Sequence, residues 1–103
     1  PESVGLCHCL DCRKHHGAVL WAAAIYRENA VTVTGDTQQY QGRHFCPRCG
    51  SSVFSCSDGE VEVHLGALDK PDQFTPTYEL WTDRRESWLT PLAGAAQYCR
   101  DRS

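Results

Sequence analysis

Polar and apolar residues alternate along much of the chain with the two-residue period of β-strands. The alternation is clearest at residues 60–65, where polar and apolar positions follow in turn: Glu60, Val61, Glu62, Val63, His64 and Leu65. Residues 52–55 precede this segment across a Ser-Asp-Gly turn, so the two segments predict a β-hairpin. Successive side chains of a strand point to opposite faces, and we expect the polar face with His64 to lie at the surface.

Further strands are predicted on both sides of this hairpin. Residues 30–34 alternate valine with threonine, and a Gly-Asp turn separates them from residues 37–40, so these two segments are expected to pair. Residues 41–45 and 77–81 are further strands, and residues 68–72 have the composition of a turn or short helix. Residues 19–26 favour a buried strand, although their alanines also fit a short helix. The pattern predicts a mainly β, mostly antiparallel domain with little helix.

Composition limits the class of protein. The 103 residues form a single domain, 1–103, and 41% hydrophobic with 22% charged residues is typical of a soluble globular protein. Residues 17–26 are the longest weakly polar run and are too short to span a bilayer, so we expect no membrane partner. No signal peptide precedes the first cysteines, which predicts a cytoplasmic protein. The net charge of −3 argues against a nucleic-acid partner.

Five of the seven cysteines fall into two clusters, Cys7-x-Cys9-x-x-Cys12 and Cys46-x-x-Cys49. On an extended segment Cys7 and Cys9 point to the same side, and the chain can turn back so that Cys12 joins them. Clustered thiols at these spacings are typical of zinc ligands. The sequence therefore predicts loops pinned by zinc knuckles.

Two other uses of these cysteines are less consistent with the sequence. A disulfide framework is disfavoured by the odd number of cysteines and by their tight pairs. Thioredoxin-like redox chemistry normally places Cys-x-x-Cys at the start of a helix within a βαβ unit, and nothing in this chain predicts that unit.

Two runs of sequence resemble the glutathione-dependent formaldehyde-activating family, whose fold is a zinc-pinned β-tent. They are GLCHCLDCRKHHG at residues 5–17 and FCPRCGS at residues 45–51. The similarity continues through VEVHLGALD at residues 61–69 and WTD at residues 81–83. It covers most of the chain.

The resemblance implies roles for the cysteines. In that family the first motif, here Cys7, Cys9 and Cys12, holds a zinc at the active site. The second motif, here Cys46 and Cys49, shares a structural zinc with a further Cys-x-Cys pair near the start of the domain, and this sequence lacks that pair. Either the pair lies upstream of this numbering, or Cys9, Cys12, Cys46 and Cys49 form one closed four-thiolate site and leave Cys7 spare.

The first arrangement predicts a zinc-dependent enzyme similar to a carbon-sulfur lyase. Its substrates would be a small thiol such as glutathione and formaldehyde or another small aldehyde, because a three-thiolate zinc keeps a position for a bound thiolate. Arg13 and Lys14 are candidates to bind carboxylates of the thiol, and they fit a solvated basic turn equally well. The closed site predicts instead a non-catalytic zinc-ribbon or β-tent module that binds a protein. Cys7 favours the enzyme, because a plain ribbon does not need it.

For the remaining residues the sequence favours ordinary structural roles. Cys56 is expected to be a small buried residue, and Cys99 to have no special role. His8 should point away from the metal, and His15 and His16 should lie on an exposed turn. The three tryptophans are expected to fill the core: Trp21, Trp81 and Trp88.

Overall fold

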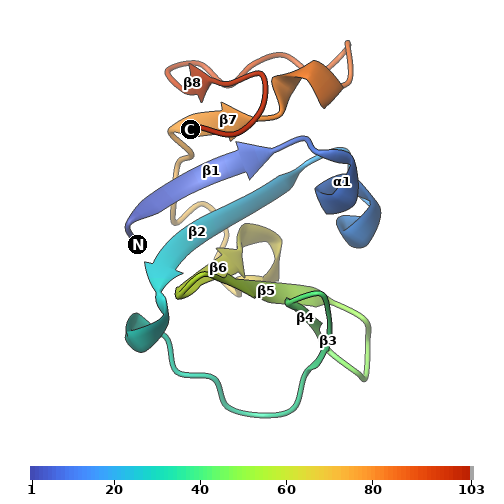
Figure 1. Cartoon of the computed structure of the whole chain (residues 1–103), viewed down its shortest axis with the longest axis vertical. Coiled ribbons are helices and arrows are strands. Elements are labelled where there is room, and N and C mark those ends of the chain that lie inside the picture. The colour runs from blue at the N-terminus through green and yellow to red at the C-terminus, as the bar shows by residue number, and fades with distance from the viewer. Residues whose placement is uncertain (103) are drawn as a thin grey trace.

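The computed structural model describes residues 1–102, and their eight strands form one sheet in the order β3-β4-β5-β6-β2-β1-β7-β8 (Figure 1). The strands are β1 (Ser3–Cys7), β2 (Trp21–Arg27), β3 (Gln38–Tyr40), β4 (Arg43–Phe45), β5 (Ser52–Ser57), β6 (Glu60–His64), β7 (Tyr78–Leu80) and β8 (Ala96–Gln97). One α-helix, α1 (Leu10–His16), lies within the described residues, together with the short 3-10 turns η1 (Glu28–Ala30), η2 (Leu65–Ala67) and η3 (Thr82–Arg84). The mainly β fold with little helix is confirmed.

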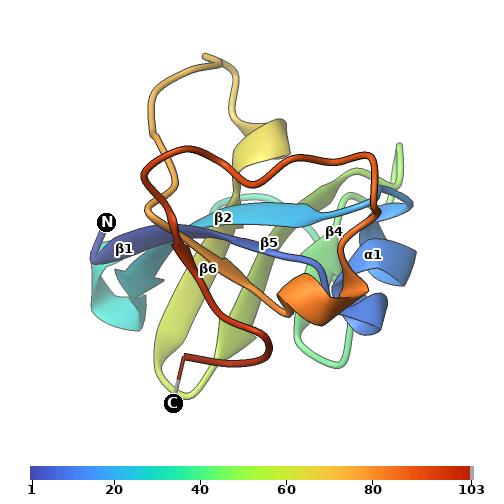
Figure 2. The ribbon, with the colours of Figure 1, turned by 90° about the horizontal axis from the view of Figure 1, so that it is seen from above.

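Most strand pairs are antiparallel, and β7 is parallel to both of its neighbours, β1 and β8. Cys7 at the end of β1 lies opposite Trp21, and Ala23 on β2 lies opposite His64. Seen from above, β5 and β6 run obliquely across β1 and β2, so the sheet is strongly twisted (Figure 2). The twist turns the polar face of β5 and β6 toward the end of β1 that carries the cysteines.

Six predicted strands are confirmed to within two residues at each end. They are residues 19–26, 37–40, 41–45, 52–55, 60–65 and 77–81, which correspond to β2, β3, β4, β5, β6 and β7. Strand β1, the short strand β8 and helix α1 were not predicted. Within residues 1–102, no helix has the length and apolar character needed to cross a membrane.

The predicted strand at residues 30–34 is wrong. The chain leaves β2 through η1 and then follows an irregular loop to β3, seen at the bottom of Figure 1. Strand β2 is already paired on both sides, with β1 and with β6, so the segment after it meets no free edge. Val33 is 51% exposed, and β3 pairs with β4 instead of with this segment.

The small core lies where β1 and β2 meet. Cys7, Trp21, Ala23 and Ile25 are buried there together. Four partly buried residues pack against this cluster: Cys9, Cys12, Leu80 and Trp81. The first cysteine motif is therefore part of the edge of the core.

Burial differs from the sequence prediction at several positions. Trp21 is buried as expected, but Trp88 is 67% exposed and Trp81 is only half-buried. Cys56 is exposed, because its face of β5 is open near the hairpin turn. His64 was expected at the surface and is only 2% exposed, since the rings of His16 and Trp21 lie against it.

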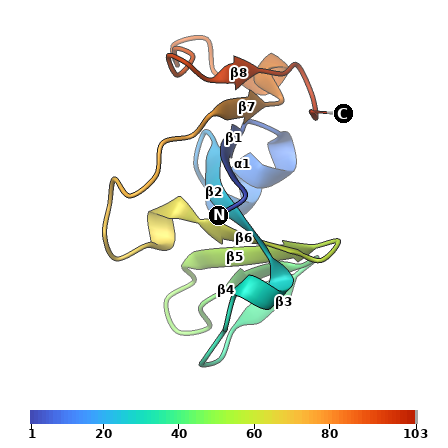
Figure 3. The same cartoon turned by 90° about the vertical axis from the view of Figure 1, so that its left-hand side faces the viewer.

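The C-terminal segment folds back over β7 and covers that side of the sheet (Figure 3). The backbone N–H of Trp81 donates to the carbonyl of Arg100, at 3.0 Å. Beneath this segment, the buried carboxylate of Glu79 accepts hydrogen bonds from the N–H of Leu92 at 2.7 Å and from the side chain of Gln97 at 2.9 Å. One carboxylate therefore anchors the last part of the chain.

Candidate functional site

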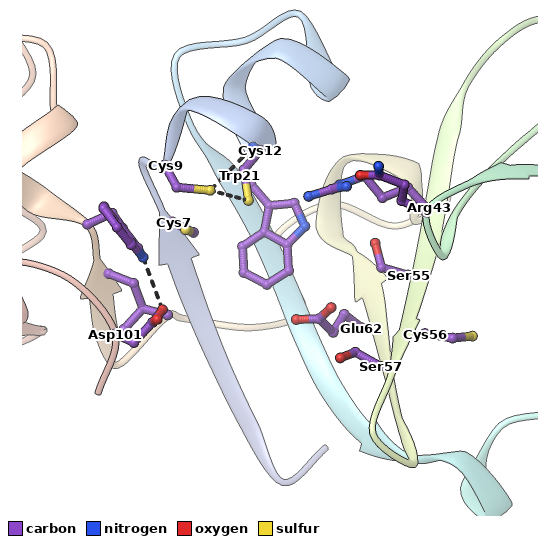
Figure 4. A pocket seen from close by; sticks show the side chains of 13 residues that line it. Cys7, Cys9, Cys12, Trp21, Arg43, Ser55, Cys56, Ser57, Glu62 and Asp101 are labelled. Carbon is purple, nitrogen blue, oxygen red and sulfur yellow. Dashed lines mark hydrogen bonds between the residues drawn. The ribbon is translucent and has the colours of Figure 1, made fainter. Parts of the chain in front are cut away.

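Three cysteines converge at the junction of β1 and α1. Cys7 is the last residue of β1, Cys9 is the N-cap of α1, and Cys12 lies in its first turn. Their sulfur atoms all lie within 4.8 Å of one another (Figure 4). An extended strand followed by a tight helical turn brings the three sulfurs together, as the spacing predicted.

Local hydrogen bonds hold the cluster in place. The Sγ of Cys9 caps the helix by accepting the backbone N–H of Cys12 at 3.3 Å, and the thiol of Cys9 donates to the sulfur of Cys12 at 2.9 Å. The hydrogen bond from Cys12 lowers the pKa of Cys7 to about 7, against the opposing effect of burial. The pKa of Cys12 is raised in turn, first by its bond to Cys7 and then by burial. Cys7 is thus the thiol of the cluster that ionises most readily, while Cys9 and Cys12 hold their protons more firmly.

The donor set can hold a metal ion. In a tetrahedral zinc-thiolate site the Zn–S distance is about 2.3 Å, which places neighbouring sulfurs about 3.8 Å apart. The three sulfurs lie within 4.8 Å of one another, close enough for one ion to reach all three. A metal ion held by these three sulfurs would have a fourth coordination position that the motif does not fill, and a cavity adjoins the sulfurs.

The second cysteine motif forms a separate knuckle between β4 and β5. Gly50 has a φ of 78°, and its N–H donates to the carbonyl of Cys46 at 2.8 Å. The backbone N–H groups of Arg48 and Cys49 face the Cys46 sulfur and lower its pKa. Across residues 1–102, the first motif is the only group of three or more metal-ligating side chains. The structure therefore does not assemble a four-sulfur site from both motifs.

A cavity of about 320 Å³ adjoins the three sulfurs. On the cysteine side it is bounded by apolar residues: Trp21, Leu80 and Trp81. The opposite wall comes from β4, β5 and β6 and carries polar side chains: Arg43, Ser55, Ser57 and Glu62 (Figure 4). The volume lies at the lower end of the range for small-molecule sites, so the cavity fits a small ligand.

Arg13 and Lys14 lie on α1 and line a different, shallow depression. Arg13 donates to the carbonyl of Arg84 at 2.9 Å and pairs with Glu86 at 2.6 Å. Their binding of substrate carboxylates stays a prediction. The cation that lines the cavity is Arg43, which the sequence analysis missed because only the pairing of β4 with β5 brings it there.

His8 lies between two of the cysteines in sequence but points away from them, as predicted. Its Nε2 is 2.7 Å from Oε1 of Glu79, and both side chains are almost completely buried. Since an ionised carboxylate can only accept, Nε2 is the donor of this contact. The residue fixes the segment between Cys7 and Cys9 against β7.

A histidine pair behind the polar wall was not predicted. The His64 ring lies 4.6 Å from that of His16, and its two nitrogens contact the hydroxyls of Ser52 at 2.9 Å and Ser55 at 2.8 Å. Burial lowers the pKa of both histidines to about 4, so they are neutral at physiological pH. His15 and His16 are half-buried on α1, and their expected place on an exposed turn is wrong.

Comparison with known families gives a match over most of the chain. A family model described as glutathione-dependent formaldehyde-activating enzyme matches residues 1–84, which include both cysteine motifs and the polar strands. No curated protein matches the sequence.

Proposed function

Because the chain belongs to the glutathione-dependent formaldehyde-activating family, we propose that it is a zinc-dependent enzyme of the carbon-sulfur lyase type. Its substrates are a glutathione-like thiol and formaldehyde or a similarly small aldehyde, which it joins or separates at the carbon-sulfur bond. The observation that carries the proposal is the convergence of three cysteine sulfurs at the edge of a cavity. A purely structural zinc site would be closed by four protein ligands.

In this proposal Cys7, Cys9 and Cys12 hold the zinc and form the reactive centre. A zinc ion there would stabilise a substrate thiolate or polarise an oxygen. The protein contributes a fixed arrangement of the sulfurs, since two of them belong to the first turn of a helix. Partial burial keeps bulk water away from the cluster.

The cavity supplies the binding contacts. Arg43 can pair with a carboxylate of a glutathione-like thiol, while Trp21 and Leu80 offer apolar surface to its chain. Arg13 and Lys14 lie outside the cavity, and we assign them the weaker role of attracting an anionic thiol to this side of the molecule.

Cys46 and Cys49 complete the proposal as two ligands of a structural zinc. Their knuckle joins β4 to β5 and so supports the polar wall of the cavity. Because the sulfurs must stay reduced to bind metal, we place the protein in a reducing compartment such as the cytoplasm.

The test is a two-dimensional NMR exchange measurement on glutathione and ¹³C-formaldehyde, which also react spontaneously. We expect the zinc-loaded protein to raise the exchange rate between free formaldehyde and the adduct, and the same protein treated with a chelator to lose most of the increase. An exchange rate equal to that of the spontaneous reaction, at full zinc occupancy, would reject the proposal for this substrate pair.

A further inference from the structure

Glu62 lies at the centre of the polar wall opposite the three cysteines. It occupies the middle of β6, and its register partners are Ser55 on β5 and Ile25 on β2. Its carboxylate points from β6 toward Trp21 and into the cavity (Figure 4). A ligand in the cavity would therefore lie between this carboxylate and the sulfur cluster.

The carboxylate of Glu62 is half-buried and accepts no hydrogen bond or ion pair from any described residue. Glu79 shows the contrast, because its carboxylate is held by donors on four residues: His8, Arg85, Leu92 and Gln97. A partly buried carboxylate without donors is unfavourable for folding, since its lost hydration is not replaced. Such a group in a cavity indicates a role with a ligand.

The surroundings of Glu62 favour proton exchange. Burial raises the pKa of Glu62, the nearby carboxylate of Glu60 raises it further, and Arg43 opposes them. Across the cavity lie the cysteine thiols and Asp101. The group thus holds a proton more readily than an ordinary glutamate does.

Other titratable groups around the cavity are less suited to exchange a proton with a ligand. Asp101 accepts the indole N–H of Trp81 at 3.0 Å. Both nitrogens of His64 are engaged by serine hydroxyls, and the guanidinium of Arg43 offers donors but no acceptor. Cys56 on β5 also borders the cavity, but its thiol points away from the sulfur cluster (Figure 4). Among the described residues, Glu62 is therefore the carboxylate of this wall that has no hydrogen-bond donor.

We propose that Glu62 carries the proton that moves between sulfur and oxygen when the carbon-sulfur bond is made or broken. In the direction of bond formation, its carboxylate takes the thiol proton while the sulfur bonds to the carbonyl carbon and the carbon-oxygen π bond opens. The carboxylic acid then returns the proton to the oxygen, which gives the hydroxyl of the adduct. Glu62 ends in its starting state, and the reverse sequence separates the adduct. This inference rests on the proposed function.

The decisive variant is Glu62→Gln, which keeps the shape of the side chain and removes its acid-base capacity. A positioned acid-base group contributes at least about a hundredfold to a rate, so we expect the catalysed exchange rate to fall by about that factor. Zinc content and the dissociation constant for glutathione should be unchanged. Glu28→Gln is the matched control, because it makes the same chemical change at an exposed position outside the cavity, on a residue that does not affect the Glu62 carboxyl. Its rate should stay within about twofold of wild type.

A second measurement does not depend on activity. In the zinc-free protein, a ¹³C NMR titration should show the carboxyl of Glu62 with a pKa above the ordinary value of 4.5. Glu62→Asp is the alternative variant if Glu62→Gln does not fold. It keeps the carboxylate on a shorter side chain, so we expect a lower exchange rate with the same pH dependence as wild type.

The outcomes separate the two proposals. If wild type accelerates the exchange and Glu62→Gln accelerates it equally, Glu62 is not the proton carrier and the proposed function still stands. A Glu62 carboxyl that titrates at or below 4.5 would also overturn the inference, and the proposed function would still stand. If wild type gives no acceleration, the proposed function fails and the inference fails with it.

Discussion

His8 and Glu79 form a buried contact of 2.7 Å between residues 71 positions apart in the sequence. His8 belongs to the cysteine motif, and Glu79 holds the C-terminal segment on β7. The geometry of the candidate metal centre therefore depends on a carboxylate that lies outside the motif. Fold stability and the position of the sulfurs are linked through this pair.

Replacing Glu79 should destabilise the fold. In Glu79→Gln one acceptor oxygen becomes an amide donor, so at least one buried donor among its partners loses its acceptor. We expect the free energy of unfolding to fall by about 1–3 kcal/mol, measured by urea denaturation. Glu86→Gln, which removes a more exposed ion pair with Arg13, should change it by less than about 1 kcal/mol. Equal effects of the two changes would contradict the anchoring role.

The same carboxylate predicts how stability depends on acidity. Burial acts to raise the pKa of Glu79, but the bonds from Gln97, His8, Leu92 and Arg85 outweigh it and lower the pKa to about 2. The ionised group therefore stabilises the fold fully above the ordinary pKa of 4.5, and the contribution is lost as the pH falls toward 2. Below pH 4.5 the unfolding free energy of wild type should decrease more steeply than that of Glu79→Gln. Parallel curves would show that the carboxylate is not preferentially ionised in the fold.

Gly5 is required where β1 meets β7. A Cβ atom at this position would lie 2.2 Å from a ring atom of Tyr78, which is buried and opposite it in register. Gly5→Ala should therefore lower the free energy of unfolding by about 1–3 kcal/mol or more, through displaced strands. Gly66→Ala is the control, since nothing lies within 4 Å of its added Cβ and its φ is not positive. A tolerated Gly5→Ala, judged by thermal denaturation, would contradict this packing.

Removal of one sulfur should weaken metal binding at the first motif. Cys7→Ser is expected to lower the tightly bound zinc by one equivalent per chain, measured by elemental analysis after dialysis, because only two thiolates remain there. Cys99→Ser, an exposed thiol outside the motif, should leave the zinc content unchanged. Unchanged zinc in Cys7→Ser would indicate that Cys7 is not a ligand.

The sequence was sufficient for features determined by local pattern. Alternation and turn residues identified β5 and β6, and cysteine spacing identified two knuckles. The sequence was not sufficient for features that depend on which strands become neighbours in the sheet. Residues 30–34 have strand composition but no free edge to pair with, and the polar face that contains Glu62 and His64 was expected in solvent.

The residues of the site other than the cysteines could not be predicted from the sequence for the same reason. Arg43 and Glu62 line the same cavity as the three sulfurs only because β4, β5 and β6 add to β2 in one fixed register. Glu79 gave no local signal, since its partners come from the cysteine motif and from the C-terminal segment. Such contacts follow from tertiary structure and have no short motif.

The most direct test of an open three-sulfur site is ¹¹³Cd NMR of the protein with cadmium in place of zinc, because each bound ion gives its own resonance. We predict one resonance that shifts when glutathione is added and that disappears in Cys7→Ser, as expected for an ion that accepts a fourth sulfur from the ligand. Resonances that all stay fixed at saturating glutathione would contradict the account, because they would show that protein ligands already fill every coordination position.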